Sequence, residues 1–336
     1  MKNVLYIGNN LKSKSTNISS IQALGSQLEQ EGYTMYYASS ISNKVLRLLD
    51  MIWMVVKCSR KIDYVIIDTY STLNFYYAIL ISQLCRLLKL KYITNLNGGN
   101  LPARLINNQK LSALLFKNAH YNVSPSDYLN DAFYSFGFTK VRYIPNTIIL
   151  KNYKFRKKDY DPIRLLWVRS FSRIYNPILA IEVIKQLELE GYKASLCMVG
   201  PDSDGTLKEV KKLVKLNKLN VKFTGKLPKS EWITLAEDYN IFINTTNFDN
   251  TPVSVIEAMA LGLTIVSTNV GGMPYLIENN EEGLLVEPND AKAMAKAIIN
   301  LFKNPDSAKR MSLNARQKVE QFDWEVVKHR WLDILE

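Results

Sequence analysis

Short runs of β-forming residues alternate with longer stretches of helical apolar spacing along nearly the whole chain. In the first half, helices are expected over residues 17–30, 45–57, 73–88 and from about 127. Strands are expected at Val4–Ile7, Met35–Ala38, Tyr64–Ile67, Tyr92–Leu96, Tyr121–Val123 and Val141–Ile144. Because strands and helices alternate, the pattern predicts βαβ units around a parallel sheet.

A second series of the same kind follows a polar segment, Lys151–Pro162, which we interpret as a linker. Its strands are expected at Arg164–Val168, Ser195–Val199, Lys222–Thr224, Ile241–Asn244, Thr264–Ser267 and Leu284–Val286. The sequence therefore predicts an α/β fold with two Rossmann-like domains, 1–155 and 156–320, and a ligand cleft between them. A terminal helix, 321–336, carries Trp331, Ile334 and Leu335 and is expected to cross back to the first domain.

The composition of the 336 residues, 47% hydrophobic and 22% charged, excludes disorder, collagen and coiled coil. The formal net charge is +12, of which +9 falls on residues 1–150 and +3 on residues 151–336. Such a surplus indicates an acidic partner, which could be nucleic acid, an anionic membrane or a phosphorylated ligand.

Three cysteines lie far apart in apolar stretches: Cys58, Cys85 and Cys197. Their odd number and spacing predict buried, reduced thiols. The histidines, His120 and His329, lack metal-ligand spacing, so no zinc site is expected. The first apolar run is too short for a signal peptide, and the charge-free run Thr69–Cys85 is too polar and short to span a membrane. We therefore expect a cytosolic chain.

The segment that follows the Ile241–Asn244 run carries the clearest chemistry. Thr251 is expected to cap a helix and Pro252 to occupy its first position. The free N–H groups around Val253 and Ser254 would then form an anion site suited to a phosphate or diphosphate.

Glu257 is the only charged residue between positions 250 and 277. A carboxylate buried among apolar neighbours is costly unless it is hydrogen-bonded, and ribose hydroxyls are suitable donors. The alternative is a structural glutamate satisfied by the backbone or by a neighbouring lysine. Asp249 lies eight positions earlier, where it could hold a sugar or reacting group; alone, it would be interpreted as a capping or turn residue.

The run from Asp249 to Gly262, followed by Thr264–Pro274, resembles the acid–x7–Glu signature of family 4 retaining glycosyltransferases, the glycosyl transferases group 1. The resemblance implies the GT-B fold, in which two Rossmann-like domains enclose the active site. It implies that Glu257 binds the donor ribose and that Asp249, usually Glu in the family, contacts the donor sugar. Asn250, Thr251, Pro252, Val253 and Ser254 would face the sugar and diphosphate, and Gly271-Gly272 would form a tight turn.

The same resemblance assigns further residues in the second half. Arg169, and Arg173 in place of the family lysine, would bind the diphosphate, for which arginine is suited by its bidentate geometry. Gly200 would lie near the nucleotide, with Lys226 and Leu227 near the base.

In the first half, Asn97 stands where many relatives have a histidine that contacts the donor sugar, and Gly98 and Gly99 follow it. An amide can hydrogen-bond a sugar hydroxyl but cannot titrate as a base. Gly8 and Asn9 resemble the family's first glycine-rich loop near the donor diphosphate.

Cofactor motifs are weak or missing. The absence of GxGxxG argues against a dinucleotide oxidoreductase. Asp202-Ser203-Asp204 matches the DxD metal motif of another glycosyltransferase fold, but we interpret it as a turn. No cofactor and no metal are expected.

The segment Asn43–Asp63 combines apolar side chains and Trp53 with basic residues towards both ends. The pattern is typical of a helix at a membrane surface, and the alternative is a buried helix with snorkelling basic ends.

We predict a metal-independent, hexosyltransferase-type enzyme that moves a sugar from a nucleoside-diphosphate sugar to an acceptor hydroxyl with retention. Its expected role is bacterial-type surface polysaccharide or glycolipid synthesis, with a glycan or lipid-linked acceptor, in the cytoplasm or peripherally on the inner membrane face. The expected catalytic residues are Asp249, Glu257, Arg169 and Asn97. The alternatives are a sugar-nucleotide epimerase or hydrolase on the same fold, and a basic nucleic-acid-binding protein.

Overall fold

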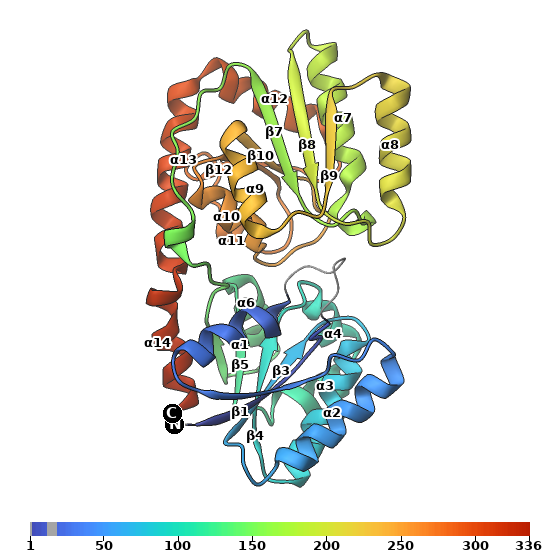
Figure 1. Cartoon of the computed structure of the whole chain (residues 1–336), viewed down its shortest axis with the longest axis vertical. Coiled ribbons are helices and arrows are strands. Elements are labelled where there is room, and N and C mark those ends of the chain that lie inside the picture. Colours follow the sequence, from blue (N-terminus) through green and yellow to red (C-terminus); the bar gives the residue numbers. More distant parts are fainter. Residues whose placement is uncertain (1, 12–18) are drawn as a thin grey trace. The chain divides into compact units, whose positions relative to one another are not determined.

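The computed structural model describes residues 2–11 and 19–336, and the chain divides into two compact units (Figure 1). Unit 1 comprises Met1–Pro145 and Lys328–Glu336, and unit 2 comprises Asn146–Val327. The division therefore lies ahead of position 155, the boundary expected from the sequence. Among the described residues, no helix is both long and apolar enough to cross a bilayer.

Unit 1 contains a six-stranded parallel sheet in the order β2-β1-β3-β4-β5-β6. The strands are β1 (Asn3–Ile7), β2 (Thr34–Ala38), β3 (Tyr64–Thr69), β4 (Lys91–Leu96), β5 (Tyr121–Ser124) and β6 (Val141–Tyr143). The helices are α1 (Ser20–Gln30), α2 (Lys44–Cys58), α3 (Asn74–Leu87), α4 (Leu101–Asn107), α5 (Gln109–Phe116) and α6 (Asp127–Ser135). All six expected strands are present, and residues 17 and 18 of the first expected helix lie outside the described residues.

Unit 2 contains a second parallel sheet in the order β12-β11-β10-β7-β8-β9. The strands are β7 (Ile163–Val168), β8 (Ala194–Val199), β9 (Val221–Gly225), β10 (Ile241–Asn244), β11 (Thr264–Thr268) and β12 (Gly283–Val286). The helices are α7 (Pro177–Leu189), α8 (Thr206–Asn217), α9 (Lys229–Leu235), α10 (Val253–Ala260), α11 (Met273–Leu276), α12 (Ala291–Lys303) and α13 (Pro305–Val319), with 3-10 turns η1 (Leu150–Asn152), η2 (Arg173–Tyr175), η3 (Ala236–Asp238) and η4 (Glu320–Phe322). The predicted α/β class with two Rossmann-like sheets is confirmed.

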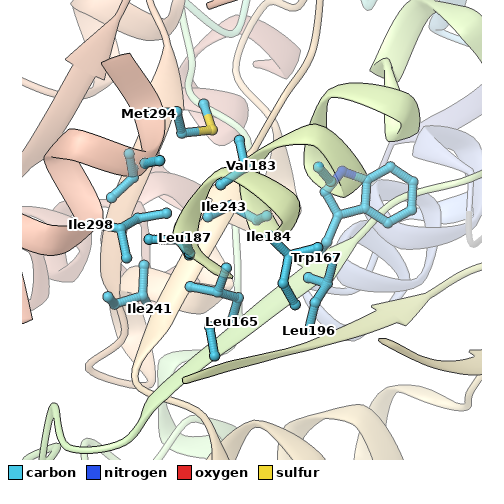
Figure 2. Close-up of a cluster of buried hydrophobic side chains, with 14 of the residues drawn as sticks. Leu165, Trp167, Val183, Ile184, Leu187, Leu196, Ile241, Ile243, Met294 and Ile298 are labelled. Carbon is cyan, nitrogen blue, oxygen red and sulfur yellow. The ribbon is translucent and has the colours of Figure 1, made fainter. Parts of the chain in front are cut away.

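The central strands of unit 2 are buried on both faces. Because successive side chains of a strand point to opposite faces, Leu165 and Trp167 pack toward α7 and α12 while Leu166 packs in the cluster that includes α10. Figure 2 shows the first of these clusters, where Leu187 of α7 lies against the sheet. Two apolar layers thus hold the loops at the carboxyl edge of the sheet.

The expected linker, Lys151–Pro162, is not a solvated linker. Tyr153, Lys158 and Tyr160 are buried within unit 2. Lys158 Nζ donates to the carbonyl oxygens of Ala236 and Glu237, at 2.9 and 3.0 Å. Burial of a polar segment is tolerated here because its polar atoms find partners.

The last helix, α14 (Trp324–Leu335), begins in unit 2 and ends in unit 1. Trp331, Ile334 and Leu335 are buried, and Lys328 Nζ lies 3.4 Å from Glu31 Oε1 within unit 1. The three cysteines are buried and free, as expected from the sequence.

Each sheet has one point where the strand order reverses direction. In unit 1 this point lies between β1 and β3, and in unit 2 between β7 and β10. Loops that leave adjacent parallel strands diverge at such a point, and open α/β sheets bind their ligands there. The residues after these four strands are therefore the first candidates for a functional site.

Truncation of Leu187 to alanine is expected to lower the free energy of unfolding of unit 2 by about 2–5 kcal/mol, because it leaves a cavity in the core. Leu189→Ala on the same helix, where the side chain is 72% exposed, is the matched control and should change it by no more than about 0.5 kcal/mol. Urea unfolding followed by circular dichroism measures both, and equal effects would contradict the described core.

Candidate functional site

The loops after β7 and β10 bring two predicted residues together in unit 2. Arg169 Nη2 forms a short ion pair with Asp249 Oδ2. The guanidinium group also lies over the ring of Tyr175, 4.7 Å from its centre, and Asp249 Oδ1 accepts from the amide of Asn250 at 2.9 Å. The pair therefore has a fixed orientation at the carboxyl edge of the sheet.

Glycines allow close backbone contacts around this pair. Gly271 has a φ of +54°, and a β-carbon there would collide with the carbonyl oxygen of Asp249. A β-carbon at Gly272 would collide with the carbonyl of Asn250, and the Gly272 amide donates to the Asp249 carbonyl at 3.1 Å. Gly200 packs in the same way against the carbonyl of Arg169, with a φ of +149°. These glycines are required by packing of the site loops.

Helix α10 begins one residue later than expected. Pro252 is its N-cap, in an extended conformation, so the prediction that Thr251 caps the helix is wrong. The helix starts later because Pro252 has a ψ of 120°, which is extended, although its φ is fixed by the ring at a value that a helix would also accept. The Thr251 carbonyl instead accepts from Asn146 Nδ2 at 2.7 Å.

Unsatisfied polar groups gather at the predicted anion-binding residues. The amides of Val253 and Ser254, in the first turn of α10, have no acceptor within the helix, because the first amide to donate back is that of Val255, to the Pro252 carbonyl at 3.0 Å. Within the described chain, Ser254 Oγ and Arg169 Nε are buried without a hydrogen-bond partner. Buried polar atoms of this kind call for a ligand or water, and these are donors suited to an anion.

Glu257 projects from α10 into a buried, polar environment and is 4% exposed. Tyr153 Oη donates to its Oε1 at 2.6 Å, and Lys229 Nζ lies 2.6 Å from the same oxygen. Burial and the Glu257 carboxylate raise the pKa of Tyr153, so its hydroxyl remains a donor. Both interactions use Oε1, which leaves Oε2 for another donor among the described contacts.

Tyr153 and Lys229 were missed in the sequence. Tyr153 lies in the segment interpreted as a linker, and Lys229 begins α9, two residues after Leu227. The lysine required by the structural alternative for Glu257 is thus present. The signal available was the presence of three aromatic residues, Tyr153, Phe155 and Tyr160, in an otherwise polar segment.

The remaining predicted residues of unit 2 lie at the edge of this region or in turns. Arg173 is exposed on η2, and its backbone amide donates to Asp204 Oδ2 at 2.8 Å. Asp202 Oδ1 accepts from the Gly205 amide at 2.9 Å, as expected for a turn. Among residues 2–11 and 19–336, no group of three or more His, Cys, Asp or Glu is arranged to hold a metal ion.

In unit 1, the edge of the sheet between β1 and β4 carries a buried polar network that the sequence did not reveal. Asp68 Oδ1 accepts from Tyr6 Oη at 2.9 Å, from Asn95 Nδ2 at 3.1 Å and from Asn97 Nδ2 at 2.7 Å. Because its amide nitrogen donates to Asp68, the carbonyl oxygen of Asn97 is the atom that can accept from a hydroxyl. The expected contact of Asn97 with a donor sugar stays a prediction.

Burial raises the pKa of Asp68 to about 7. Its Oδ2 is buried and has no partner among the described residues, and a β-carbon at Gly8 would collide with it. Gly8 is therefore required by Asp68, whereas Asn9 is held by Arg47, whose Nη1 donates to its Oδ1 at 2.9 Å.

The turn after β4 depends on a close approach of the backbone. A β-carbon at Gly98 would collide with the backbone of Tyr70 and Ser71, and Gly99 follows in the same turn. The turn fixes where Asn97 leaves the strand, because the Asn97 amide donates to the Thr69 carbonyl at 3.0 Å.

Comparison with known families identifies the chain. The glycosyl transferases group 1 family matches residues 151–318, which is half of the chain. The chain belongs to this family. The matched region contains the Arg169–Asp249 pair and Glu257.

Curated relatives include two proteins named as biosynthesis glycosyltransferases. The chain is 30% identical over 202 residues to the amylovoran biosynthesis glycosyltransferase AmsK of Erwinia amylovora, covering 55% of this chain and 47% of the relative. It is 26% identical over 192 residues to the putative colanic acid biosynthesis glycosyltransferase WcaL of Escherichia coli, covering 54% and 46%. The matches thus span about half the length of these relatives.

Solved structures share the fold across the whole chain. Sucrose-phosphate synthase from Thermosynechococcus elongatus superposes with a TM-score of 0.82 at 17% identity, covering 99% of this chain and 98% of that one. Anabaena HepE in complex with UDP gives 0.79 at 16% identity, covering 100% and 99%. These likenesses confirm the GT-B fold of this group 1 chain.

Replacement of Asp68 by asparagine is expected to change how stability depends on pH. The unfolded carboxyl group ionises at its ordinary pKa of 3.8, whereas the folded group holds its proton to about 7. In the wild type, the contribution of Asp68 to the free energy of unfolding therefore falls as pH rises from about 4 to about 7. The difference in free energy of unfolding between Asp68→Asn and wild type should shift by up to about 4 kcal/mol across that window.

Urea unfolding at several pH values measures this shift. Asp63→Asn, which alters an exposed carboxyl group just ahead of the same strand, is the matched control. A difference between Asp68→Asn and wild type that does not vary with pH would contradict the buried, protonated carboxyl group.

Proposed function

We propose that the chain is a retaining glycosyltransferase that moves a sugar from a nucleoside-diphosphate sugar to an acceptor hydroxyl. The observation that carries the proposal is Glu257, fixed at Oε1 by Tyr153 and Lys229 and with Oε2 left for the donor ribose. A carboxylate held in this way accepts a hydroxyl pair with little loss of side-chain entropy.

The diphosphate is bound by the first turn of α10 and by Arg169. The amides of Val253 and Ser254, the buried Ser254 Oγ and Arg169 Nε supply donors that no protein group satisfies in the described chain. Charge builds up on the leaving diphosphate as the bond from the sugar carbon to the phosphate oxygen breaks, and these preorganised donors stabilise it. The proposal needs no metal ion, because positive charge comes from Arg169 and the helix N-terminus.

Asp249 contacts a hydroxyl group of the sugar in this proposal. It is oriented by Arg169 and by the turn at Gly271. The acceptor oxygen attacks the same face that the diphosphate leaves, and its proton passes to the departing phosphate oxygen.

The relatives support the donor and the pathway class. HepE has been solved with UDP and with UDP-glucose, which favours a UDP-sugar donor. AmsK is named for the biosynthesis of amylovoran and WcaL, as a putative enzyme, for that of colanic acid, so we propose a surface polysaccharide or glycolipid intermediate as the acceptor. The buried free cysteines fit a reaction on the cytosolic side.

Replacement of Glu257 by glutamine should weaken UDP binding about 10- to 100-fold, because a charge-assisted hydrogen bond is lost. Titration calorimetry with UDP, GDP and ADP, followed by a transfer and hydrolysis assay with the corresponding glucose donors, measures this effect. Glu182→Gln, an exposed acid on α7, is the matched control and should bind normally.

Equal UDP affinity of Glu257→Gln and wild type, or no nucleotide binding by the wild type, would overturn the proposal. Release of free sugar at a rate that no acceptor changes would instead favour the hydrolase alternative.

Replacement of Gly271 by alanine should reduce sugar transfer at least tenfold, because the new methyl group displaces the Asp249 carbonyl. Gly191→Ala is the matched control: its φ is also positive, at +82°, but its surroundings are open, so it bears only the backbone cost of about 1 kcal/mol. Steady-state rates together with melting temperatures separate the two effects. Equal activity of the two variants would show that the turn does not support Asp249.

A further inference from the structure

Helix α2 is apolar on both of its sides. Its inner side contributes Met51, Val55 and Cys58 to the core of unit 1. Its outer side carries five exposed apolar side chains: Val45, Leu46, Leu49, Trp53 and Val56. A helix at a water-facing surface normally carries polar residues outward, so this side lacks the partner that its composition requires.

Helix α3 lies beside α2 and also carries exposed apolar side chains. It packs against α2, and Tyr77 Oη donates to the Lys44 carbonyl at 3.2 Å (Figure 1). Four exposed apolar side chains, from its N-cap to its last residue, have the spacing of a single helical face: Leu73, Tyr76, Leu80 and Leu87. Eleven of the 19 large hydrophobic side chains exposed in the described residues lie between positions 45 and 114. Their concentration on neighbouring helices indicates an interaction surface.

Basic residues surround this surface. Lys44 begins α2, and Lys57, Arg60 and Lys61 lie at its other end; all are exposed, and none forms an ion pair in the described part of the chain. Residues 41–118 contain only three acids, Asp50, Asp63 and Asp68. Asp68 is buried, and Asp63 accepts from the Asn3 amide at 2.8 Å.

We propose that the outer sides of α2 and α3 form a docking surface for a lipid bilayer that contains anionic headgroups. Apolar side chains of this size enter the boundary between headgroups and acyl chains, while flanking lysine and arginine side chains reach the phosphates. The buried-helix alternative accounts for the inner side of α2 only.

A second copy of this chain fits the surface less well. In a two-fold dimer the same patch meets itself, so the basic ends of one α2 helix would lie close to the basic ends of the other. Like charges at a contact oppose association, whereas an anionic bilayer complements both the apolar and the basic side chains. This inference concerns unit 1 alone and does not depend on the proposed sugar transfer.

Flotation of the purified chain with vesicles tests the proposal. We expect it to float with vesicles of 70% phosphatidylcholine and 30% phosphatidylglycerol, and at least tenfold less with phosphatidylcholine alone. The double variant Leu49→Ser/Trp53→Ser, and separately the triple variant Lys57→Ser/Arg60→Ser/Lys61→Ser, should each lose at least tenfold of the partition coefficient. Leu216→Ser, at an equally exposed apolar position on α8 of unit 2, is the matched control and should float like wild type.

Trp53 gives a second readout that does not depend on removing the surface. It is 61% exposed, whereas the other four tryptophans, Trp167, Trp232, Trp324 and Trp331, are at most 5% exposed. Brominated acyl chains quench only tryptophans that reach the bilayer, so they should quench the wild type in anionic vesicles. Trp53→Phe should abolish this quenching while leaving flotation within about threefold.

Failure of the wild type to float, flotation that both surface variants retain, or quenching that survives Trp53→Phe would overturn the proposal. A wild-type dimer in sedimentation velocity that Leu49→Ser/Trp53→Ser converts to monomer would assign the surface to a second copy instead. Melting temperatures of all variants within about 3 °C of wild type establish that a lost interaction is not unfolding.

Discussion

The hydrogen-bonding pattern of parallel strands determines most of what this molecule can do. Every strand pair within the two sheets is parallel, so all carboxyl ends in a sheet reach one edge, and the strand order reverses once in each sheet. At those reversals the loops diverge and leave backbone and side chains accessible to a ligand. The residues of interest, Gly8 and Asp68 in unit 1 and Arg169 and Asp249 in unit 2, all lie at these points. The chemistry is therefore located by the topology before any side chain is considered.

Buried polar groups of the chain differ in whether a protein partner satisfies them. Lys158 is buried, yet its ammonium group meets two carbonyl oxygens. By contrast, Ser254 Oγ, Arg169 Nε and Asp68 Oδ2 are buried without a partner in the described chain. Desolvating such an atom costs about 1–3 kcal/mol, which the fold has to offset elsewhere. A bound ligand that supplies the missing hydrogen bonds recovers this free energy.

The sequence was sufficient for the strands and for residues that act locally. Short runs of β-forming residues predicted all twelve strands, and the position of Glu257 on a short apolar helix followed from spacing alone. It was not sufficient where a partner lies far away in the chain. Tyr153 reaches Glu257 across 104 positions, and Asn95 and Asn97 reach Asp68 only because β3 and β4 are adjacent.

Composition led to a wrong prediction for a segment that is both polar and buried. The segment Lys151–Pro162 has the charge and proline content of a linker, but its tyrosines and Lys158 are buried with satisfied polar atoms. A one-residue error at Thr251 has a similar local cause, since a proline can occupy either the first helical position or the cap and spacing does not separate the two.

The distribution of ion pairs shows how the excess positive charge of the first half differs from the charge of the second half. Six of the seven ion pairs among the described residues lie within unit 2, where they hold loops and the candidate site in place. Among the described residues of unit 1 the one ion pair joins Lys328 and Glu31. The basic residues at the ends of α2 form no ion pair in that part of the chain, and self-repulsion makes such a surplus costly unless an external anion balances it. Few environments complement a surface that carries both exposed apolar side chains and basic side chains without ion pairs. An anionic bilayer complements both.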